Sequence, residues 1–246
     1  MQASFFCRVP WAPLRAEPDS RSEMVSSVLN GESFSLLEEQ ADWLWVETVF
    51  DRYQGWISRQ QCDELQEERL HILRDPYTEI RNHAQRLHLP CGSELTRTAV
   101  WTVMDEEYTA APETAHPMMS VRSAMLDDAR RWLGAPYLWG GRTIWGCDCS
   151  GFVQVIAKIN GIALPRDASQ QALVGKEVPF EIHKPGDLVF FKNDEGRITH
   201  VGLATGGHTI LHASGEVRED LLDEKGIYNE RLGRYTHRFH SIRNIT

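Results

Sequence analysis

The octapeptide GCDCSGFV at residues 146–153 contains the strongest chemical signal in the chain. Its second cysteine, Cys149, directly precedes apolar residues with helical spacing, which predicts that it lies at a helix N-terminus. The positive end of a helix dipole favours a thiolate there. His200 and His212 follow in the strand-like segments HVGLAT and TILHAS. A cysteine followed by a histidine and a third polar residue is the arrangement of a thiol hydrolase.

Side-chain alternation along a strand tests whether the two histidines can act together. In a regular antiparallel hairpin, the numbers of any two directly paired residues have the same sum. His200 and His212 lie on the same face only if that sum is even. A two-residue turn at Gly206-Gly207 would place them on opposite faces. We therefore predict an odd loop or a bulge around residues 205–207, where glycine supplies the left-handed conformation.

Other interpretations of these residues are open. A buried cysteine is commonly an inert small hydrophobe, and a strand histidine is commonly part of the scaffold. Cys147 and Cys149 with two histidines could also bind zinc, but ligands one residue apart are not the usual structural spacing. We predict a thiol enzyme, with no metal ligand and no cofactor.

Composition narrows the function classes further. The 246 residues have a net charge of −9, which argues against nonspecific nucleic-acid binding. Five cysteines at irregular spacing favour reduced thiols in a reducing compartment. No segment is apolar enough to cross a membrane, and the N-terminus lacks the pattern of a signal peptide. The expectation is a cytoplasmic protein, the alternative being an exported one whose signal was removed.

The chain divides into three segments by pattern. Residues 1–65 contain short strand signals at 26–29, 33–37, 44–49 and 55–57, with an Asn30-Gly31 turn, which suggests a small barrel. Residues 66–119 form a linker or a degenerate second unit of the same kind, with a partly helical stretch at 67–88 and a strand at 98–104.

Residues 120–246 form the second domain. A helix capped by Ser120 has an apolar face from Val121 to Leu133, and the helix of Cys149 ends near Gly161. Strands are predicted at 187–191, 200–205, 209–214 and 238–245. Helices followed by strands indicate an α+β fold with an antiparallel sheet.

Six blocks agree in order and spacing with a known family: LGAPYLWGG, DCSGFV, LPRDASQQ, PGDLVFF, HVGLATGG and ILHAS, all within residues 120–246. The segment resembles the NlpC-type cysteine peptidases of bacterial cell-wall peptides. The pieces PLRAEP, NGE, DWLWV and GWI in residues 1–65 resemble a bacterial SH3-like domain, a frequent companion in that family.

This resemblance implies a papain-like fold and cleavage of peptidoglycan stem peptides between γ-D-Glu and the diamino acid. Cys149 matches the family nucleophile, His200 the base and His212 the residue that orients the base. Tyr137 matches a tyrosine beside the nucleophile that helps hold the oxyanion or the substrate, or else only packs. Two residues depart from the family pattern. Cys147 stands where a large apolar residue is common, and Ala168 stands where relatives sometimes have a hydroxyl residue.

Among the relatives, the chain is most similar to the cytoplasmic enzymes of murein peptide recycling, the dipeptidyl-peptidase VI-like endopeptidases. These require a free N-terminal L-Ala and release L-Ala-γ-D-Glu, which implies an acidic group for the ammonium. Candidates for that group and its surroundings are Asp148, Glu17 and Tyr53.

Ser150 and Arg166 are candidates for the substrate carboxylate, although Arg166 could equally form a structural ion pair. The expected partners are murein stem peptides, with neither nucleic acid nor membrane. A secreted hydrolase of intact wall and a non-enzymatic module that binds wall peptides are the alternatives.

Overall fold

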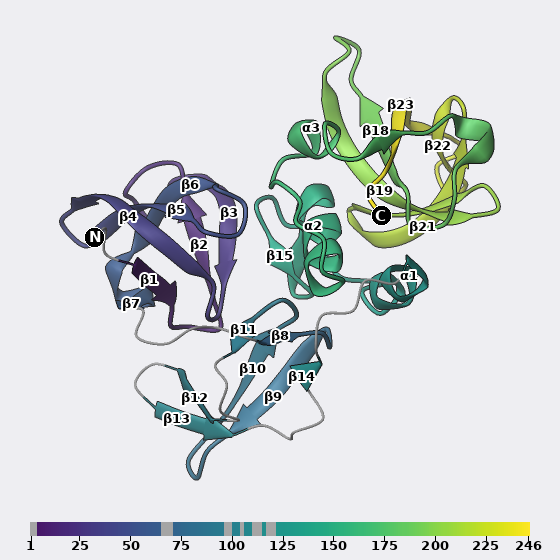
Figure 1. Cartoon of the computed structure of the whole chain (residues 1–246). Coiled ribbons are helices and arrows are strands. Elements are labelled where there is room, and N and C mark those ends of the chain that lie inside the picture. The colour runs from purple at the N-terminus through teal and green to yellow at the C-terminus, as the bar shows by residue number, and fades with distance from the viewer. Residues whose placement is uncertain (1–3, 65–70, 96–99, 104–105, 110–114, 117–121) are drawn as a thin grey trace. The chain divides into compact units, whose positions relative to one another are not determined.

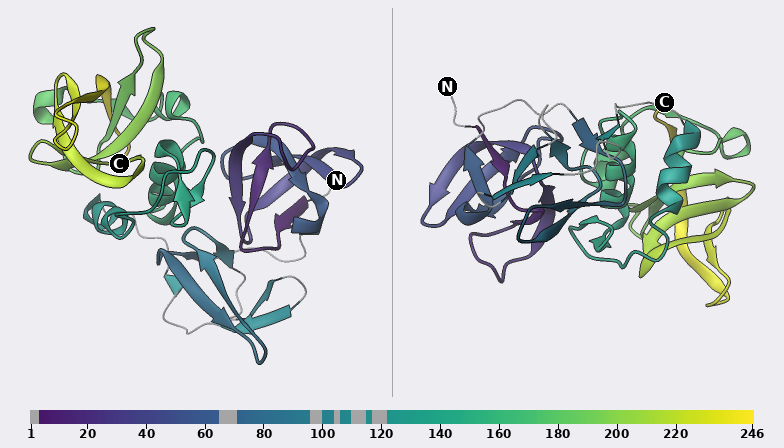
Figure 2. Two further views of the ribbon diagram at one scale, coloured as in Figure 1. Left: turned by 180° about the vertical axis from the view of Figure 1, so that it is seen from behind. Right: turned by 90° about the horizontal axis from the view of Figure 1, so that it is seen from below.

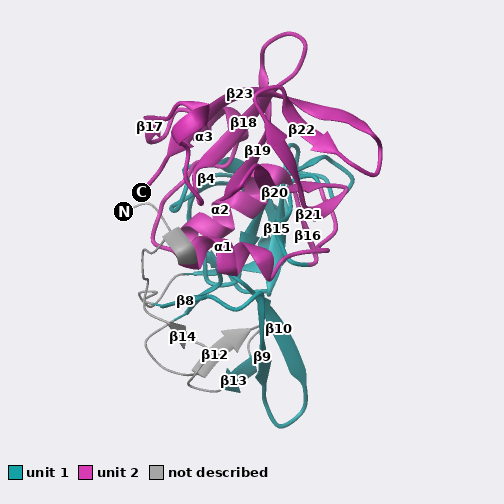
Figure 3. Cartoon of the chain, turned by 90° about the vertical axis from the view of Figure 1, so that its right-hand side faces the viewer, with its two compact units in different colours: residues 1–118, 139–144 teal, residues 119–138, 145–246 magenta. Residues whose placement is uncertain are grey.

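A computed structural model describes residues 4–64, 71–95, 100–103, 106–109, 115–116 and 122–246. The chain forms two compact units, shown in different colours in Figure 3. Unit 1 comprises residues 1–118 together with the separate segment 139–144, and unit 2 comprises residues 119–138 and 145–246.

Unit 1 begins with a seven-stranded antiparallel sheet of order β3-β2-β6-β5-β4-β1-β7 (Figure 1). In β5, Leu44 and Val46 point inward and alternate with half-buried tryptophans, as expected for a strand with one buried face. The four strands predicted in this segment are confirmed. The elements are β1 (Ser4–Cys7), β2 (Trp11–Arg15), β3 (Met24–Leu29), β4 (Ser33–Gln40), β5 (Trp43–Thr48), β6 (Gln54–Ser58), η1 (Arg59–Gln61) and β7 (Cys62–Glu64).

Residues 71–116 add short strands with a small core of their own. The helical prediction for residues 67–88 is wrong from residue 71 onward, and residues 67–70 lie outside the described part. In β9, buried Thr78 and Ile80 alternate with exposed neighbours, as expected for a strand with one buried face. The predicted strand at 98–104 is confirmed over β12. The strands are β8 (His71–Leu73), β9 (Tyr77–Arg81), β10 (Arg86–Pro90), β11 (Glu94–Leu95), β12 (Val100–Val103), β13 (Glu106–Thr109) and β14 (Ala115–His116).

The segment 139–144 completes unit 1 through a buried ion pair. The guanidinium of Arg142, in β15 (Arg142–Thr143), donates to both carboxylate oxygens of Glu32 at 2.9 Å. Both side chains are almost fully buried, and Arg142 also donates to the carbonyl of Ser27. A buried bidentate pair of this kind fixes the position of the segment within unit 1.

Unit 2 places its helices before most of its strands. Its sheet has the order β17-β23-β18-β19-β20-β21-β22, and β22 also pairs with β23, so that the sheet curves back on itself (Figure 2). Every strand pairing within this sheet is antiparallel. The elements are α1 (Arg122–Arg130), β16 (Gly146–Cys147), α2 (Cys149–Ile159), α3 (Ala168–Gln171), β17 (Lys176–Glu177), η3 (Phe180–Ile182), β18 (Leu188–Lys192), β19 (Ile198–Gly206), β20 (Thr209–Ser214), β21 (Glu216–Asp223), β22 (Gly226–Asn229) and β23 (Arg234–Asn244).

The predicted apolar helix face agrees with α1 except at its end. Met125 and Ala129 are fully buried, but the helix stops at Arg130 and Leu133 is 51% exposed. A turn after Arg130 rotates Leu133 away from the buried side. Ser120 and Val121 lie outside the described residues.

As a whole, the described chain is mostly β with few helices. None of the described helices has the length and apolar composition that crossing a bilayer requires. All five cysteines lie in the described ranges, and each is a buried free thiol.

Candidate active site

Cys149 is the first residue of α2, as the sequence predicts. Asp148 caps this helix, and its carboxylate accepts a 2.7 Å hydrogen bond from the backbone N–H of Gly151. The whole helix is buried, and Cys149 is only 7% exposed. Its sulfur lies beside the backbone N–H of Val201 in β19, so the thiol is held next to the strand residue that follows His200.

The expectation of a stabilised thiolate is wrong for the free protein. Burial, and after it the Asp148 carboxylate, raise the pKa of Cys149 to about 11. Backbone hydrogen bonds from Val201 and Ser150 act in the opposite direction but are outweighed. The helix dipole is outweighed mainly by burial of the thiol, and the negative charge of the capping Asp148 adds to this. Cys149 therefore rests as a thiol and needs a base.

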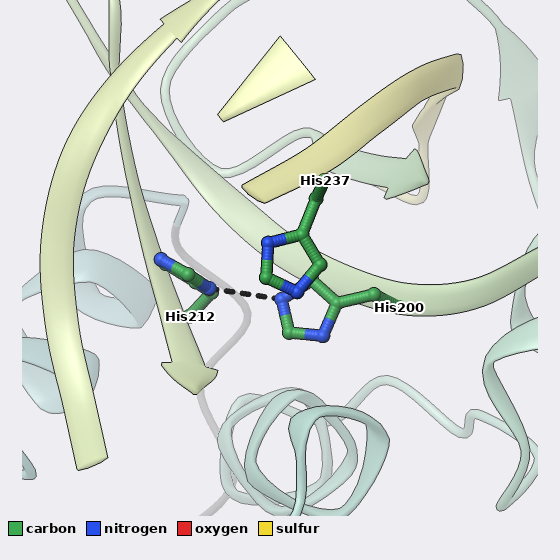
Figure 4. A group of neighbouring side chains, drawn as sticks. All are labelled: His200, His212 and His237. Carbon is green, nitrogen blue, oxygen red and sulfur yellow. Dashed lines mark hydrogen bonds between the residues drawn. The ribbon is translucent and has the colours of Figure 1, made fainter. Parts of the chain in front are cut away.

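His200 and His212 meet on one face of the sheet. The Nε2 atom of His200 lies 2.8 Å from Nδ1 of His212, and the two rings are nearly perpendicular (Figure 4). Gly202 in β19 pairs directly with His212 in β20. A Cβ atom on Gly202 would lie 2.9 Å from Cβ of His212, so glycine is needed for this close approach.

The predicted irregularity in the hairpin is confirmed. The register is even at the pairs Gly202↔His212 and Ala204↔Ile210, and it shifts before the pair Gly206↔Thr209. Gly206 and Gly207 have φ angles of +89° and +65°. This bulge keeps the two histidines on one face.

Asp220 completes a chain of hydrogen bonds that the sequence analysis missed. Its carboxylate in β21 lies 3.1 Å from Nε2 of His212 and also accepts from Arg218 and Asn229. Burial alone would raise the pKa of Asp220, but the bonds from His212 and Arg218 outweigh it and lower the pKa. The alternation of side chains along β21 could have indicated Asp220 from the sequence, because it places Asp220 on the same face as Arg218.

This chain sets the proton positions on both rings. Burial lowers the pKa of His200 and of His212, so both imidazoles are neutral near pH 7. An ionised carboxylate only accepts, so Nε2 of His212 must hold the proton and Nδ1 must accept. Nε2 of His200 then donates to His212. The remaining nitrogen of His200, Nδ1, keeps a lone pair and can act as a base.

A third imidazole, also missed, stacks on the base. The ring of His237 in β23 lies 4.0 Å from that of His200, centroid to centroid, at an interplanar angle of 24° (Figure 4). Burial lowers the pKa of His237 to about 4, and the proximity of His212 adds to this. Only strand pairing across the sheet brings His237 here, so no local sequence pattern could have found it.

Asp148, Ser150 and Arg166 form one buried cluster beside the cysteine. The guanidinium of Arg166 donates to both Asp148 oxygens, at 3.0 and 2.5 Å, and to the Ser150 hydroxyl at 2.8 Å. Arg166 and Asp148 are both almost fully buried. Arg166 therefore forms a buried ion pair, one of the two roles considered for it.

Tyr137 lies in unit 2 close to the same cluster. It is 37% exposed, and its backbone N–H donates to the carbonyl of Gly215. Burial raises the pKa of its phenol to about 12, with further contributions led by Cys149 and Asp148. A neutral phenol near the thiol can donate a hydrogen bond to an anionic intermediate.

The other two predicted residues lie in unit 1. Glu17 is exposed on the loop between β2 and β3, where its backbone N–H donates to the Ser22 hydroxyl. Tyr53 is half-buried against the core of the first sheet.

Comparisons with known proteins agree with these features. A model described as "NlpC/P60 family" matches residues 134–236, and one described as "Bacterial dipeptidyl-peptidase Sh3 domain" matches residues 14–61. The γ-D-glutamyl-L-lysine dipeptidyl-peptidase of Bacillus subtilis (strain 168) is 32% identical over 234 residues, which cover 84% of this chain and 78% of the relative. Dipeptidyl-peptidase 6 of Lysinibacillus sphaericus is 28% identical over 250 residues, covering 87% and 90%.

A solved structure shows the same fold. The crystal structure of an NlpC/P60 family protein from Bacillus cereus matches with a TM-score of 0.85 at 19% identity, over 99% of each chain. A free thiol at a helix start beside a His–His–Asp chain, together with these matches, shows that the chain belongs to the NlpC/P60 family of cysteine peptidases and has a bacterial SH3 domain of the dipeptidyl-peptidase type.

Proposed function

We propose that the chain is an endopeptidase that hydrolyses the bond between γ-D-Glu and the L-diamino acid in peptidoglycan stem peptides. The observation that carries this proposal is the 2.8 Å contact between Nε2 of His200 and Nδ1 of His212. This contact leaves Nδ1 of His200 with a lone pair that can accept the proton of the Cys149 thiol. The substrate class is supported by the relatives named γ-D-glutamyl-L-lysine dipeptidyl-peptidase and Dipeptidyl-peptidase 6.

The chemistry follows from the resting protonation states. Nδ1 of His200 takes the thiol proton as the sulfur of Cys149 attacks the γ-carbonyl carbon of D-Glu. The backbone N–H of Cys149 and the Tyr137 hydroxyl donate to the oxyanion. When the tetrahedral intermediate collapses, the amine of the diamino acid leaves with the proton from His200. Water then hydrolyses the thioester, with His200 again acting as the base.

We further propose that the substrate must carry a free N-terminal L-Ala, so that L-Ala-γ-D-Glu is the released dipeptide. Glu17 and Tyr53 are the candidates for the ammonium, because Asp148 is already matched by Arg166. Arg166 and Ser150 remain candidates for the α-carboxylate of D-Glu, acting with Asp148 as one charged cluster. In this proposal the enzyme distinguishes free from blocked peptides by the positive charge of the N-terminal ammonium.

We also propose a division of the chain into three parts. We take residues 1–65 as the SH3-like domain, 66–119 as a linker or second SH3-like unit, and 120–246 as an α+β catalytic domain of papain-like type. We propose a cytoplasmic role in murein peptide recycling, which the five free thiols support.

The test compares L-Ala-γ-D-Glu-L-Lys with its N-acetylated form, followed by mass spectrometry of the products. Release of L-Ala-γ-D-Glu from the free peptide only is expected, with no product from Cys149→Ala. Glu17→Gln and Tyr53→Phe should raise KM for the free peptide, whereas Asp19→Asn on the same loop should not. Equal rates on both peptides would reject the free-amine requirement.

The alternatives give different results in the same assay. A hydrolase of intact wall would release fragments from purified sacculi, and a binding module would retain peptides without cutting them.

A further inference from the structure

The ring nitrogens of His200, His212 and His237 lie close together. Each offers one nitrogen to the group, and these atoms all lie within 4.8 Å of one another. The residues come from β19, β20 and β23, so the sheet itself holds the cluster together (Figure 4). The proposed mechanism uses two of these rings and leaves His237 without a role.

In both His212 and His237, one ring nitrogen already has a hydrogen-bond partner outside the cluster. Nε2 of His212 lies against the Asp220 carboxylate, and Nδ1 of His237 lies 2.9 Å from the Thr236 hydroxyl. The nitrogens that face the other rings are then Nδ1 of His212, which is hydrogen-bonded to Nε2 of His200, and Nε2 of His237. An imidazole whose second nitrogen bonds a carboxylate or hydroxyl is typical of histidines that bind metals.

We propose that His200, His212 and His237 form a binding site for a transition-metal dication of the zinc type. Three neutral imidazoles match the ligand preference of Zn²⁺, Co²⁺ and Ni²⁺. His237 is half-buried and supplies the route of entry. This site contains three histidines and no cysteine. It therefore differs from the zinc site of Cys147, Cys149 and two histidines that the sequence suggested as an alternative.

The geometry needs only side-chain adjustment. Ligand nitrogens of a tetrahedral zinc lie about 3.3 Å apart, given Zn–N bonds of about 2.0–2.1 Å. The 2.8 Å pair of His200 and His212 must open by about half an ångström to meet that spacing. The half-buried ring of His237 rotates to bring the third nitrogen in.

Occupancy would inactivate the proposed peptidase, and this part rests on the proposed function. A metal takes the lone pair of Nε2 on His200, so the ring proton moves to Nδ1. The nitrogen that should accept the thiol proton is then blocked. The site therefore acts as an inhibitory switch on the base.

The test titrates Co²⁺ into Cys149→Ala protein and follows visible d–d absorption and calorimetric stoichiometry. One Co²⁺ per chain is expected, with at least a tenfold loss of affinity in Cys149→Ala/His237→Phe. Phenylalanine keeps a ring stacked on His200 but offers no nitrogen, and thermal unfolding checks that the variant folds. His240→Ala, on the same strand and exposed, should bind as before.

Binding that is unchanged by His237→Phe, or absent in Cys149→Ala, would overturn the proposal. Inhibition is measured separately, as loss of wild-type peptide cleavage with Zn²⁺ and recovery with a chelator. If no peptide is cleaved at all, the proposed function fails while the cobalt titration still decides the metal site. If Co²⁺ binds but Zn²⁺ does not inhibit cleavage, the switch is rejected.

Discussion

His212 joins the base to a carboxylate: its Nδ1 lies 2.8 Å from Nε2 of His200, while its opposite nitrogen bonds Asp220. The His212 ring thus passes a preference for one proton position from Asp220 to His200. The centroids of the two imidazole rings are 5.0 Å apart. Because an ionised carboxylate only accepts, the arrangement selects the form of His200 that can take a proton from the thiol.

Asp220→Asn should lower kcat by about 10- to 100-fold with little change in KM. An amide can either donate or accept, so it permits the opposite tautomer of His212 and then of His200. Steady-state kinetics on L-Ala-γ-D-Glu-L-Lys measures both parameters. Asp194→Asn, an exposed aspartate paired with Arg238, is the control and should leave kcat unchanged. An Asp220→Asn enzyme with wild-type kcat would show that the carboxylate sets no proton position.

The alkylation rate of Cys149 by iodoacetamide should rise about tenfold per pH unit between pH 7 and 9. The reason is that burial raises the pKa of this thiol to about 11, so the thiolate fraction grows throughout that range. Mass spectrometry of the Cys149 peptide follows the reaction. A rate that is flat from pH 5 to 8 would instead indicate a preformed thiolate–imidazolium pair.

Acid should destabilise unit 2 through its histidines. The pKa of His237 is about 4 when folded and near 6.5 when unfolded, so the unfolded chain binds more protons between these values. The free energy of unfolding therefore falls as pH falls through this window, by about 2 kcal/mol at pH 5 for this one group. Denaturant unfolding at pH 7.5 and pH 5 measures the loss.

His237→Phe removes that titrating group and should reduce the loss on acidification, whereas His240→Ala should not. An identical loss in wild type and His237→Phe would assign the acid sensitivity to other groups.

Breaking the Asp148–Arg166 pair should lower the free energy of unfolding of unit 2 by about 3–5 kcal/mol. Arg166→Met leaves a buried carboxylate without its charged partner, so it should cost more than Arg166→Met combined with Asp148→Leu. Denaturant unfolding of both variants provides the comparison. Arg197→Met, in an exposed ion pair with Glu195, should change stability little. If the single and double variants unfold alike, the pair contributes no buried electrostatic energy.

Features set by neighbouring residues were predictable from the sequence. The start of α2 at Cys149, the strands of His200 and His212, and the bulge at residues 205–207 all follow from local periodicity and glycine placement. The requirement that His200 and His212 share a face led to the predicted bulge, and the observed register agrees with it.

Features set by long-range packing were not predictable. His237 reaches His200 only because β23 pairs with β18, and Arg142 meets Glu32 across 110 residues. The pKa of Cys149 depends on burial, which reverses the effect expected from the helix dipole. Residues 77–81 lie in the stretch predicted to be partly helical, but they form a strand in which alternate residues are buried.

The most direct test of the account is to identify the residue that becomes acylated during turnover. Rapid acid quenching of the enzyme with L-Ala-γ-D-Glu-L-Lys, followed by peptide mass spectrometry, should find the L-Ala-γ-D-Glu acyl group on Cys149, and nothing in Cys149→Ala. An acyl group on another residue, or hydrolysis of the peptide by Cys149→Ala protein, would contradict the central claim.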